Sequence, residues 1–355
     1  MKKRNRNRIK IIKIKNKKKI RQKKKKHLFK NITKNKKIFL KAFLFLLLLF
    51  INYFIEILYF KFFAGGEYIL DIKDFHRRYT VIPNIKEDIT LVSAYFNVKS
   101  KYSKTEYLNW INNFLQINHS MIFFIDNTYY EEIISKRPKE YQKKTIWVKT
   151  NITDFYSYKK FFKEFNQTHE LDEEKKIYSV PIYLVWAEKI NFLKIAAVKN
   201  FFNSKCFYWV DAGCFRDNSK IKKYINNWPS SEKCFEDGRI LLNEIIKHTK
   251  EVKDGLKEFN VELHNNFQRF HNVDPSIFGG KKKYIFKFAE LYYNTIKLFV
   301  KHGIFIGKER NLFTYISYFY TDVVKLVYSG FYFYFQEYLS KDYNKTNKYY
   351  FMHII

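Results

Sequence analysis

The pattern of apolar and polar residues divides the chain into an N-terminal part with one long apolar run and a longer part with many short ones. The long run covers residues 38–60, and its 23 residues are enough for a helix to cross a hydrocarbon layer of about 30 Å. Lys41 and Glu56 lie near its two ends, where both side chains can reach a membrane interface. Residues 44–50 show no polar face, which disfavours a helix packed on a soluble core. We therefore expect one transmembrane helix over 38–60.

Beyond residue 88, apolar runs of strand length alternate with segments of helical periodicity. Ile89 to Phe96 has the composition of a strand, and Ser103 to Glu106 is a capping box that begins a helix. The same alternation predicts strands at Met121–Ile125, Thr145–Lys149 and Cys206–Val210, and helices at Tyr130–Ser135 and Tyr183–Phe201. It is typical of an α/β fold with a mostly parallel sheet flanked by helices, in which ligands bind at the carboxyl ends of the strands.

The pattern is weaker after residue 217. It predicts a helical region at Glu232–Phe259, a turn at Phe278–Gly280, a helix at Tyr284–Lys301 and an aromatic core helix at Phe313–Phe335. Asp322 and Lys325 argue against a second membrane span in the last of these. The expected organisation is a basic tail at 1–37, a signal anchor at 38–60, a stem at 61–87 and one globular domain at 88–355.

Charge is concentrated at the N-terminus. Residues 1–37 contain 20 Lys or Arg and no Asp or Glu, so they hold 20 of the 33 net positive charges. The rest of the chain is only mildly basic, and we expect a membrane partner and no specific nucleic acid. The positive-inside rule keeps the tail cytosolic, which predicts a type II membrane protein with a lumenal domain. A cleaved signal peptide is the alternative, because Ala64-Gly65-Gly66 offers a cleavage site.

Two further features bear on the compartment. The cysteines Cys206, Cys214 and Cys234 lack metal-ligand spacing and form one disulfide at most. A lumenal domain would also make four sequons candidate glycan sites, at Asn118, Asn151, Asn166 and Asn344.

The segment Tyr208–Arg216 carries the strongest chemical signal, since a buried strand delivers Asp211 to a turn of small residues. A carboxylate at a strand end can hold a divalent cation that neutralises a diphosphate, and Gly213 would let the backbone approach it. Arg216 could form a forked contact with a phosphate. The alternative is that Asp211 merely caps the turn.

Seven segments carry a resemblance to a known family: Ile89–Phe96, Tyr107–Trp110, Phe123–Asp126, Leu184–Lys189, Asn200–Ser204, Phe207–Arg216 and Ile277–Gly280. Over roughly residues 88–325 the chain resembles the HtrL/YibB-like family, which is regarded as glycosyltransferase-like. The resemblance implies a fold similar to the GT-A (Rossmann-like) nucleotide-sugar transferases, whose Asp-x-Asp element binds metal and diphosphate. Here Asp211-Ala212-Gly213 lacks the second carboxylate. Either Asp211 binds Mn²⁺ or Mg²⁺ with help from elsewhere, or no metal is needed.

The resemblance also implies roles for single residues. Its substrate-binding candidates are Asp126, Trp186, Lys189, Asp211, Gly213, Arg216, Gly279 and Gly280. Lys189 could face the donor phosphates or be a solvated helix charge, and Asp126 could contact the ribose or base or begin a turn. The two glycines could admit the acceptor or make a turn. Glu309 is the candidate catalytic base, in a segment where Arg310 departs from the amide expected of the family.

These features predict a type II membrane glycosyltransferase of the Golgi or endoplasmic reticulum. It would transfer a sugar from a nucleotide-sugar donor to a lumenal or surface glycan or glycoprotein. The alternatives are an inactive member that binds a glycan or nucleotide, favoured by the missing carboxylate, and a membrane-anchored structural protein whose tail is the functional part.

Overall fold

The computed structural model describes residues 41, 43–48, 50–51, 85–259, 272–331 and 334–341. The chain divides into two units, residues 1–67 and 68–355. The described residues of the first unit are helical, and no helix among the described residues is long and apolar enough to cross a membrane. The predicted tail, most of the predicted anchor and nearly all of the predicted stem lie outside the described residues.

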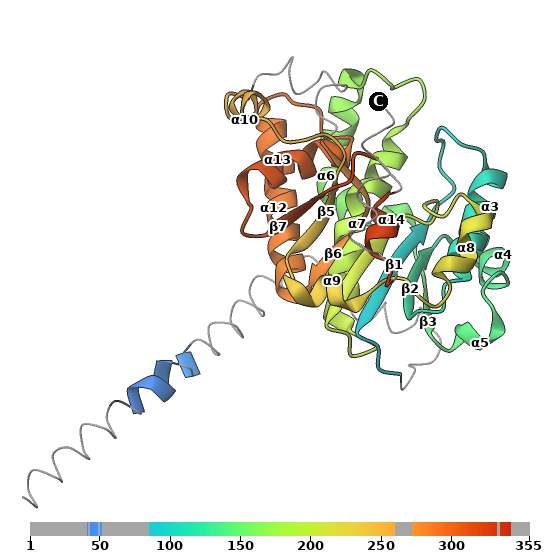
Figure 1. The fold of residues 1–355 in the computed structure, drawn as a ribbon. Helices are drawn as coiled ribbons and strands as arrows, with labels where there is room; N and C mark the ends of the chain where they lie inside the picture. Colours follow the sequence, from blue (N-terminus) through green and yellow to red (C-terminus); the bar gives the residue numbers. More distant parts are fainter. Residues whose placement is uncertain are drawn as a thin grey trace, which may run out of the picture. The chain divides into compact units, whose positions relative to one another are not determined.

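The second unit is built on a seven-stranded sheet (Figure 1). Its strands are β1 (Ile89–Tyr95), β2 (Met121–Ile125), β3 (Thr145–Lys149), β4 (Cys206–Val210), β5 (Ile240–Glu244), β6 (Val273–Lys281) and β7 (Val324–Tyr328). They lie in the order β3-β2-β1-β4-β6-β5-β7. Strands β1 to β4 pair in parallel, β5 and β7 pair in parallel, and β6 runs antiparallel to both of its neighbours. The predicted mostly parallel α/β sheet is confirmed.

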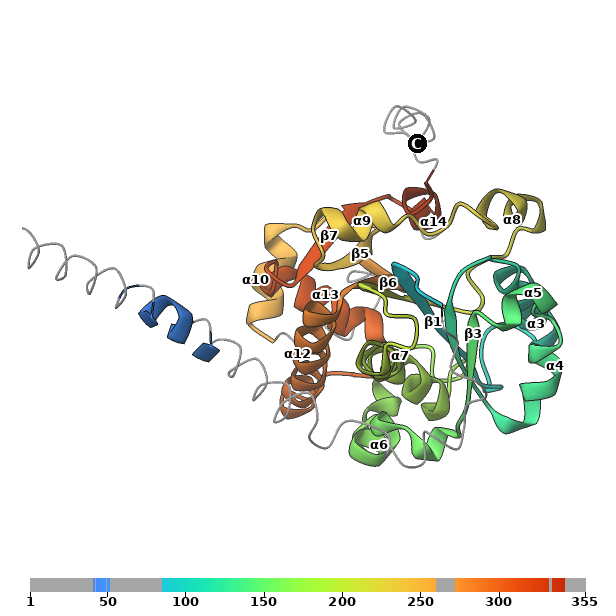
Figure 2. The same ribbon diagram turned by 90° about the horizontal axis from the view of Figure 1, so that it is seen from below.

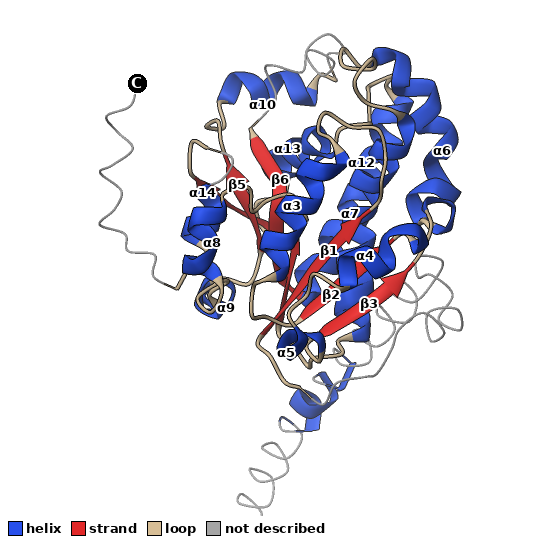
Figure 3. Ribbon diagram, turned by 90° about the vertical axis from the view of Figure 1, so that its right-hand side faces the viewer, coloured by secondary structure: helices blue, strands red, loops and turns tan. Residues whose placement is uncertain are grey.

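Helices cover both faces of this sheet (Figures 2 and 3). The α-helices are α3 (Lys104–Leu115), α4 (Tyr130–Ile134), α5 (Lys139–Gln142), α6 (Tyr156–Thr168), α7 (Val180–Lys199), α8 (Asn218–Tyr224), α9 (Ser231–Glu236), α10 (Lys250–Lys257), α12 (Lys282–Lys301), α13 (Glu309–Phe319) and α14 (Tyr334–Tyr338). Short 3₁₀ turns are η2 (Asn127–Tyr129), η3 (Ile152–Asp154) and η4 (His169–Leu171). Buried side chains of α6, α7, α12 and α13 form one core with one sheet face, whereas those of α3, α4 and α8 form a second core with the other.

Burial on both faces explains why β2 and β4 are continuous apolar runs. All five residues of β2 and all five of β4 are buried. Alternate residues point to opposite cores: Trp209 lies in the core under α7, and its neighbour Tyr208 lies in the core under α3. Continuous apolar runs are the expected signature of such strands.

Several predicted elements are confirmed. Strands β2, β3 and β4 have the predicted bounds, and α7 begins three residues before the predicted start. The capping box of α3 is also present, since the Ser103 side chain accepts from the Glu106 backbone and the Ser103 N–H donates to the Glu106 carboxylate at 2.8 Å.

Three predictions in the C-terminal half are wrong, two of them only in part, because α9, α10 and most of α13 lie within the predicted helical regions. The helical region at 232–259 contains β5, and the core helix at 313–335 contains β7. The turn at 278–280 is part of β6. These strands pair with segments distant in sequence, and such pairing outweighs a local helical pattern.

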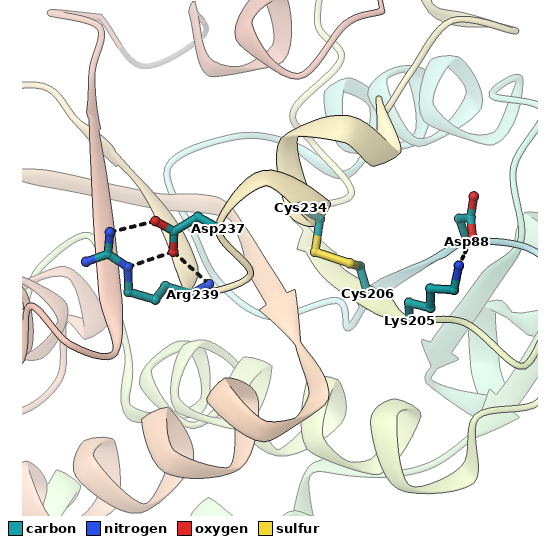
Figure 4. Close-up of a disulfide and its surroundings, with 6 residues drawn as sticks. All are labelled: Asp88, Lys205, Cys206, Cys234, Asp237 and Arg239. Atoms are coloured by element: carbon teal, nitrogen blue, oxygen red, sulfur yellow. Dashed lines mark hydrogen bonds and ion pairs between the residues drawn. A yellow bond between two sulfur atoms is a disulfide. The ribbon is translucent and has the colours of Figure 1, made fainter.

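A disulfide joins Cys206, at the start of β4, to Cys234 in α9 (Figure 4). Cys214 is a free, buried thiol. This agrees with the predicted limit of one disulfide. Two ion pairs lie close by in the same view: Lys205 with Asp88, and Arg239 with Asp237. The disulfide therefore ties the central strand to the surface helix that precedes β5.

The packing of the sheet leaves no room for a side chain at Gly279 or Gly280. Gly279 pairs with Tyr208 of β4, and a Cβ added to it would lie 2.1 Å from the Phe207 carbonyl oxygen. At Gly280 the same atom would lie 2.5 Å from the Arg239 carbonyl oxygen. The close approach that these glycines allow is to neighbouring backbone.

We expect Gly279→Ala to lower the free energy of unfolding by about 1–3 kcal/mol, because the added methyl group must push two strands apart. Urea denaturation of the second unit measures the change. Lys283→Ala, on an exposed position of α12, is the control and should shift stability by less than about 0.5 kcal/mol. Equal stability of the Gly279 variant and the parent would contradict this packing.

Candidate functional site

A cleft with two adjoining lobes opens at the carboxyl ends of β1 and β4. The larger lobe has a volume of about 580 Å³ and the smaller one about 130 Å³. Both are lined by Trp186, Lys189, Asp211 and Arg216, four of the residues that the sequence singled out. Clefts of about 300–1,000 Å³ are typical of small-molecule sites. The larger lobe is therefore big enough for a nucleotide-sized ligand.

Lys189 is the electrostatic centre of this cleft. Its side chain is 4 % exposed, and its Nζ lies 2.8 Å from Asp211 Oδ1 and 2.7 Å from Glu309 Oε1. Burial by itself would lower the pKa of Lys189, but the two carboxylates outweigh burial and raise it. The ammonium therefore stays charged throughout the neutral pH range. Lys189 is not a solvated helix charge.

Asp211 is oriented by three groups. The first is the Lys189 ammonium. The second is Trp209, whose Nε1 donates a hydrogen bond to Asp211 Oδ1 at 2.7 Å. The backbone N–H of Asp211 donates to the Ser276 carbonyl at 2.8 Å, which ties the turn after β4 to β6. The side chain is 34 % exposed and faces both lobes. A fixed carboxylate thus lies at the edge of the central strand.

Gly213 occupies the position at which an Asp-x-Asp element has its second carboxylate. A Cβ at this position would lie 3.1 Å from the Trp110 ring and 3.2 Å from the Tyr107 ring. Both contacts are tighter than usual, so a side chain here would require the two rings of α3 to move by a few tenths of an ångström.

Aromatic rings line both sides of the cleft. The Arg216 guanidinium lies over Trp110 at 4.2 Å and over Tyr102 at 4.6 Å from the ring centroids. On the opposite side, Trp186 packs edge-on against Tyr178 at 5.2 Å. Flat apolar faces beside charged groups suit a ligand that has rings and phosphates.

Glu309 begins α13 and is 6 % exposed. The preceding residue, Lys308, is fully buried and pairs with Asp172 at 3.1 Å and with Glu174. These contacts fix the start of α13 to the segment before α7. Because Glu309 Oε1 already accepts from Lys189, a transferred proton would have to compete with that contact.

Three predicted site residues lie elsewhere. Asp126 Oδ1 accepts from the Thr128 N–H at 2.7 Å and begins the turn η2, as the alternative interpretation held. Asp126 does not line either lobe, and neither do Gly279 and Gly280, which lie inside the sheet.

Asp274 and Ser276 line the larger lobe at the start of β6 and were not predicted as site residues. Because β6 runs antiparallel to β4, its amino end reaches the edge where β4 has its carboxyl end. The prediction of ligands at the carboxyl ends of parallel strands does not cover such a strand. The available signal was that Asp274 lies three residues before Ile277, where a segment resembling the family begins.

The described residues do not fit a divalent cation held at Asp211. Oxygen ligands of the right kind are present, but the Lys189 ammonium lies 2.8 and 3.1 Å from the two oxygens of Asp211. The carboxylate that would bind a cation is thus already paired with an ammonium. No group of three or more His, Cys, Asp or Glu side chains in the described part of the chain could bind a metal ion.

We expect Lys189→Met to lower the free energy of unfolding by about 3–5 kcal/mol, because it leaves the Glu309 carboxylate buried without a counter-charge. Urea denaturation at neutral pH measures the loss, and replacing Glu309 by Leu as well should recover part of it. Lys205→Ala is the matched control: its partner Asp88 is 52 % exposed, so that pair should contribute less than about 1 kcal/mol. If Lys189→Met and Lys205→Ala lower the free energy of unfolding by similar amounts, the buried ion pairs of Lys189 do not stabilise the fold more than an exposed pair does.

No family model matches the chain, and no curated protein matches it. Among solved structures the chain is similar to core-mannan synthase A from Aspergillus fumigatus in its Mn/GDP form. The sequence identity is 12 %, the TM-score is 0.38, and the match covers 68 % of this chain and 73 % of that chain. A likeness at this TM-score does not establish a shared fold or activity.

Proposed function

We propose that this chain is a GT-A-like glycosyltransferase that moves a sugar from a nucleotide-sugar donor to a hydroxyl group of a glycan or glycoprotein. The observation that carries the proposal is the cleft at the end of the central strand, where Asp211, Lys189 and Arg216 meet between aromatic walls. The resemblance to the HtrL/YibB-like family supports it, because the matched segments supply these three residues.

The proposed reaction breaks the bond between the sugar C1 and the donor diphosphate, which leaves with the electron pair. A bond then joins C1 to the acceptor oxygen, whose proton must be removed. Stabilising the departing diphosphate is the main electrostatic demand. Arg216 and Arg310 both line the larger lobe, and their guanidinium groups can bind the departing diphosphate. Lys189 holds Asp211 and Glu309 in place.

We further propose the predicted type II topology, with the catalytic unit in the Golgi or endoplasmic reticulum. Two observations support it. The described apolar side chains of the first unit are exposed, with Phe45 and Phe50 each at 64 %, as expected for a helix that is covered by lipid. The Cys206–Cys234 disulfide suits an oxidising compartment.

A second candidate function is binding of a nucleotide or glycan without turnover. One observation favours it: Asp211 and Glu309 are both engaged by Lys189, so neither is a free carboxylate. Turnover of the donor distinguishes the two functions, because a pure binding protein would retain the sugar nucleotide intact.

We expect the purified second unit to hydrolyse or transfer from at least one nucleotide sugar, and Asp211→Asn to lower that rate at least tenfold by releasing Lys189 and Trp209. Release of nucleoside diphosphate from a panel of donors, with Mn²⁺ or with EDTA, measures it. Asp254→Asn on the exposed α10 is the control and should keep the parental rate. Donor binding with no turnover of any donor would favour the second candidate.

We expect the full chain, expressed in a eukaryotic secretory pathway, to carry N-glycans at Asn151 and Asn166, whose side chains are exposed. Glycosidase treatment should increase electrophoretic mobility, and Asn151→Gln with Asn166→Gln should remove most of the shift. A chain that shows no shift and whose second unit is cleaved by protease added to the cytosolic side would contradict the topology.

A further inference from the structure

Asp274 is a carboxylate of the cleft in addition to Asp211 and Glu309. It lies in β6, two residues before Ser276, whose carbonyl accepts from the Asp211 N–H. Asp274 and Asp211 both line the larger lobe, together with Glu309. Three carboxylates from three separate elements therefore face one cavity.

The surroundings of Asp274 differ from those of the other two. Its Oδ1 accepts from the Ser276 N–H at 3.0 Å, and its Oδ2 accepts from Ser276 Oγ at 2.8 Å and from Asn243 Nδ2 at 3.5 Å. All of these donors are neutral. Asp274 is 4 % exposed, and no cation of the described residues forms an ion pair with it. Asp211 and Glu309, in contrast, share Lys189.

Burial raises the pKa of Asp274 to about 6, and the charge of Asp211 adds to this effect. The hydrogen bonds from Ser276 and Asn243 act in the opposite direction. The other ionisable groups facing this end of the cleft are Lys189 on α7, Glu309 and Arg310 on α13, and the Cys214 thiol after β4. A general base works best when its pKa lies close to the working pH.

We propose that Asp274, rather than Glu309, takes the proton from the acceptor hydroxyl; this rests on the proposed glycosyl transfer. As the acceptor oxygen bonds to C1 of the sugar, its proton passes to the Asp274 carboxylate, and the C1–O electron pair leaves with the diphosphate. Asp274 then releases the proton to water. Glu309 serves as a positioning residue that holds Lys189 beside Asp211.

The test is the pH dependence of sugar transfer by the full chain. We expect Asp274→Asn to lower kcat by about 10²- to 10⁴-fold and to abolish the acidic limb of the profile. Ser276→Ala removes a donor that lowers the pKa of Asp274, so it should move that limb to higher pH. Glu309→Gln should retain the limb. Asp254→Asn should leave the profile unchanged.

Two measurements separate a lost base from a damaged fold. Binding of nucleoside diphosphate should stay within about twofold in Asp274→Asn. Its thermal midpoint at pH 8 should not fall, because a raised pKa means that the folded state loses stability when Asp274 ionises, and Asn carries no charge. An unfolded Asp274→Asn leaves Ser276→Ala as the deciding variant.

The outcomes distinguish this inference from the proposed function. A parental protein that transfers sugar while Asp274→Asn keeps its rate and its acidic limb would overturn the role of Asp274 only. The same holds if Ser276→Ala leaves the limb in place, or if Glu309→Gln is the variant that loses it. Absence of transfer by the parent from every donor overturns the proposed function and the inference with it.

Discussion

A single buried ammonium connects three parts of the chain that form the cleft. Lys189 comes from α7, Asp211 from the turn after β4, and Glu309 from the start of α13. The buried charges of Lys189 and Glu309 are stable only when they are paired, whereas Asp211 is 34 % exposed and adds a second carboxylate to the same ammonium. The position of α13 and the orientation of the Asp211 carboxylate are therefore coupled. A shift of α13 would therefore change both the packing of the core and the orientation of the Asp211 carboxylate in the cleft.

The first half of the fold could be predicted because its signals are local. Strands β1 to β4 are buried on both faces and read as short apolar runs, and the capping box of α3 lies within four residues. The second half could not be predicted in this way. Strand β5 carries Asn243 and Glu244 at its end, and β7 is only partly buried, so neither has an uninterrupted apolar run. Both exist through pairing with distant segments.

The same contrast applies to the site. Asp211, Lys189 and Arg216 lie in segments whose motifs could be recognised, and the structure brings them to one cleft. Gly279 also lies in a recognisable segment, but its place inside the sheet depends on the register of β6 on β4, which the sequence does not show. Asp274 reaches the cleft only because β6 runs against the other strands. The direction of one strand therefore determines which residues join the site, and that direction depends on contacts remote in sequence.

The Asp-Ala-Gly turn carries one carboxylate, and the rings of Tyr107 and Trp110 pack closely against its glycine. A second acidic group reaches the cleft from another element. Strand β6 brings Asp274 to the cleft from the opposite chain direction, into surroundings of neutral donors. Two carboxylates beside one another then differ in their partners: Asp211 is bound to an ammonium, and Asp274 is bound to hydroxyl and amide groups. Burial raises the pKa of Asp274 to about 6, close to the working pH at which a carboxylate can take up and release a proton.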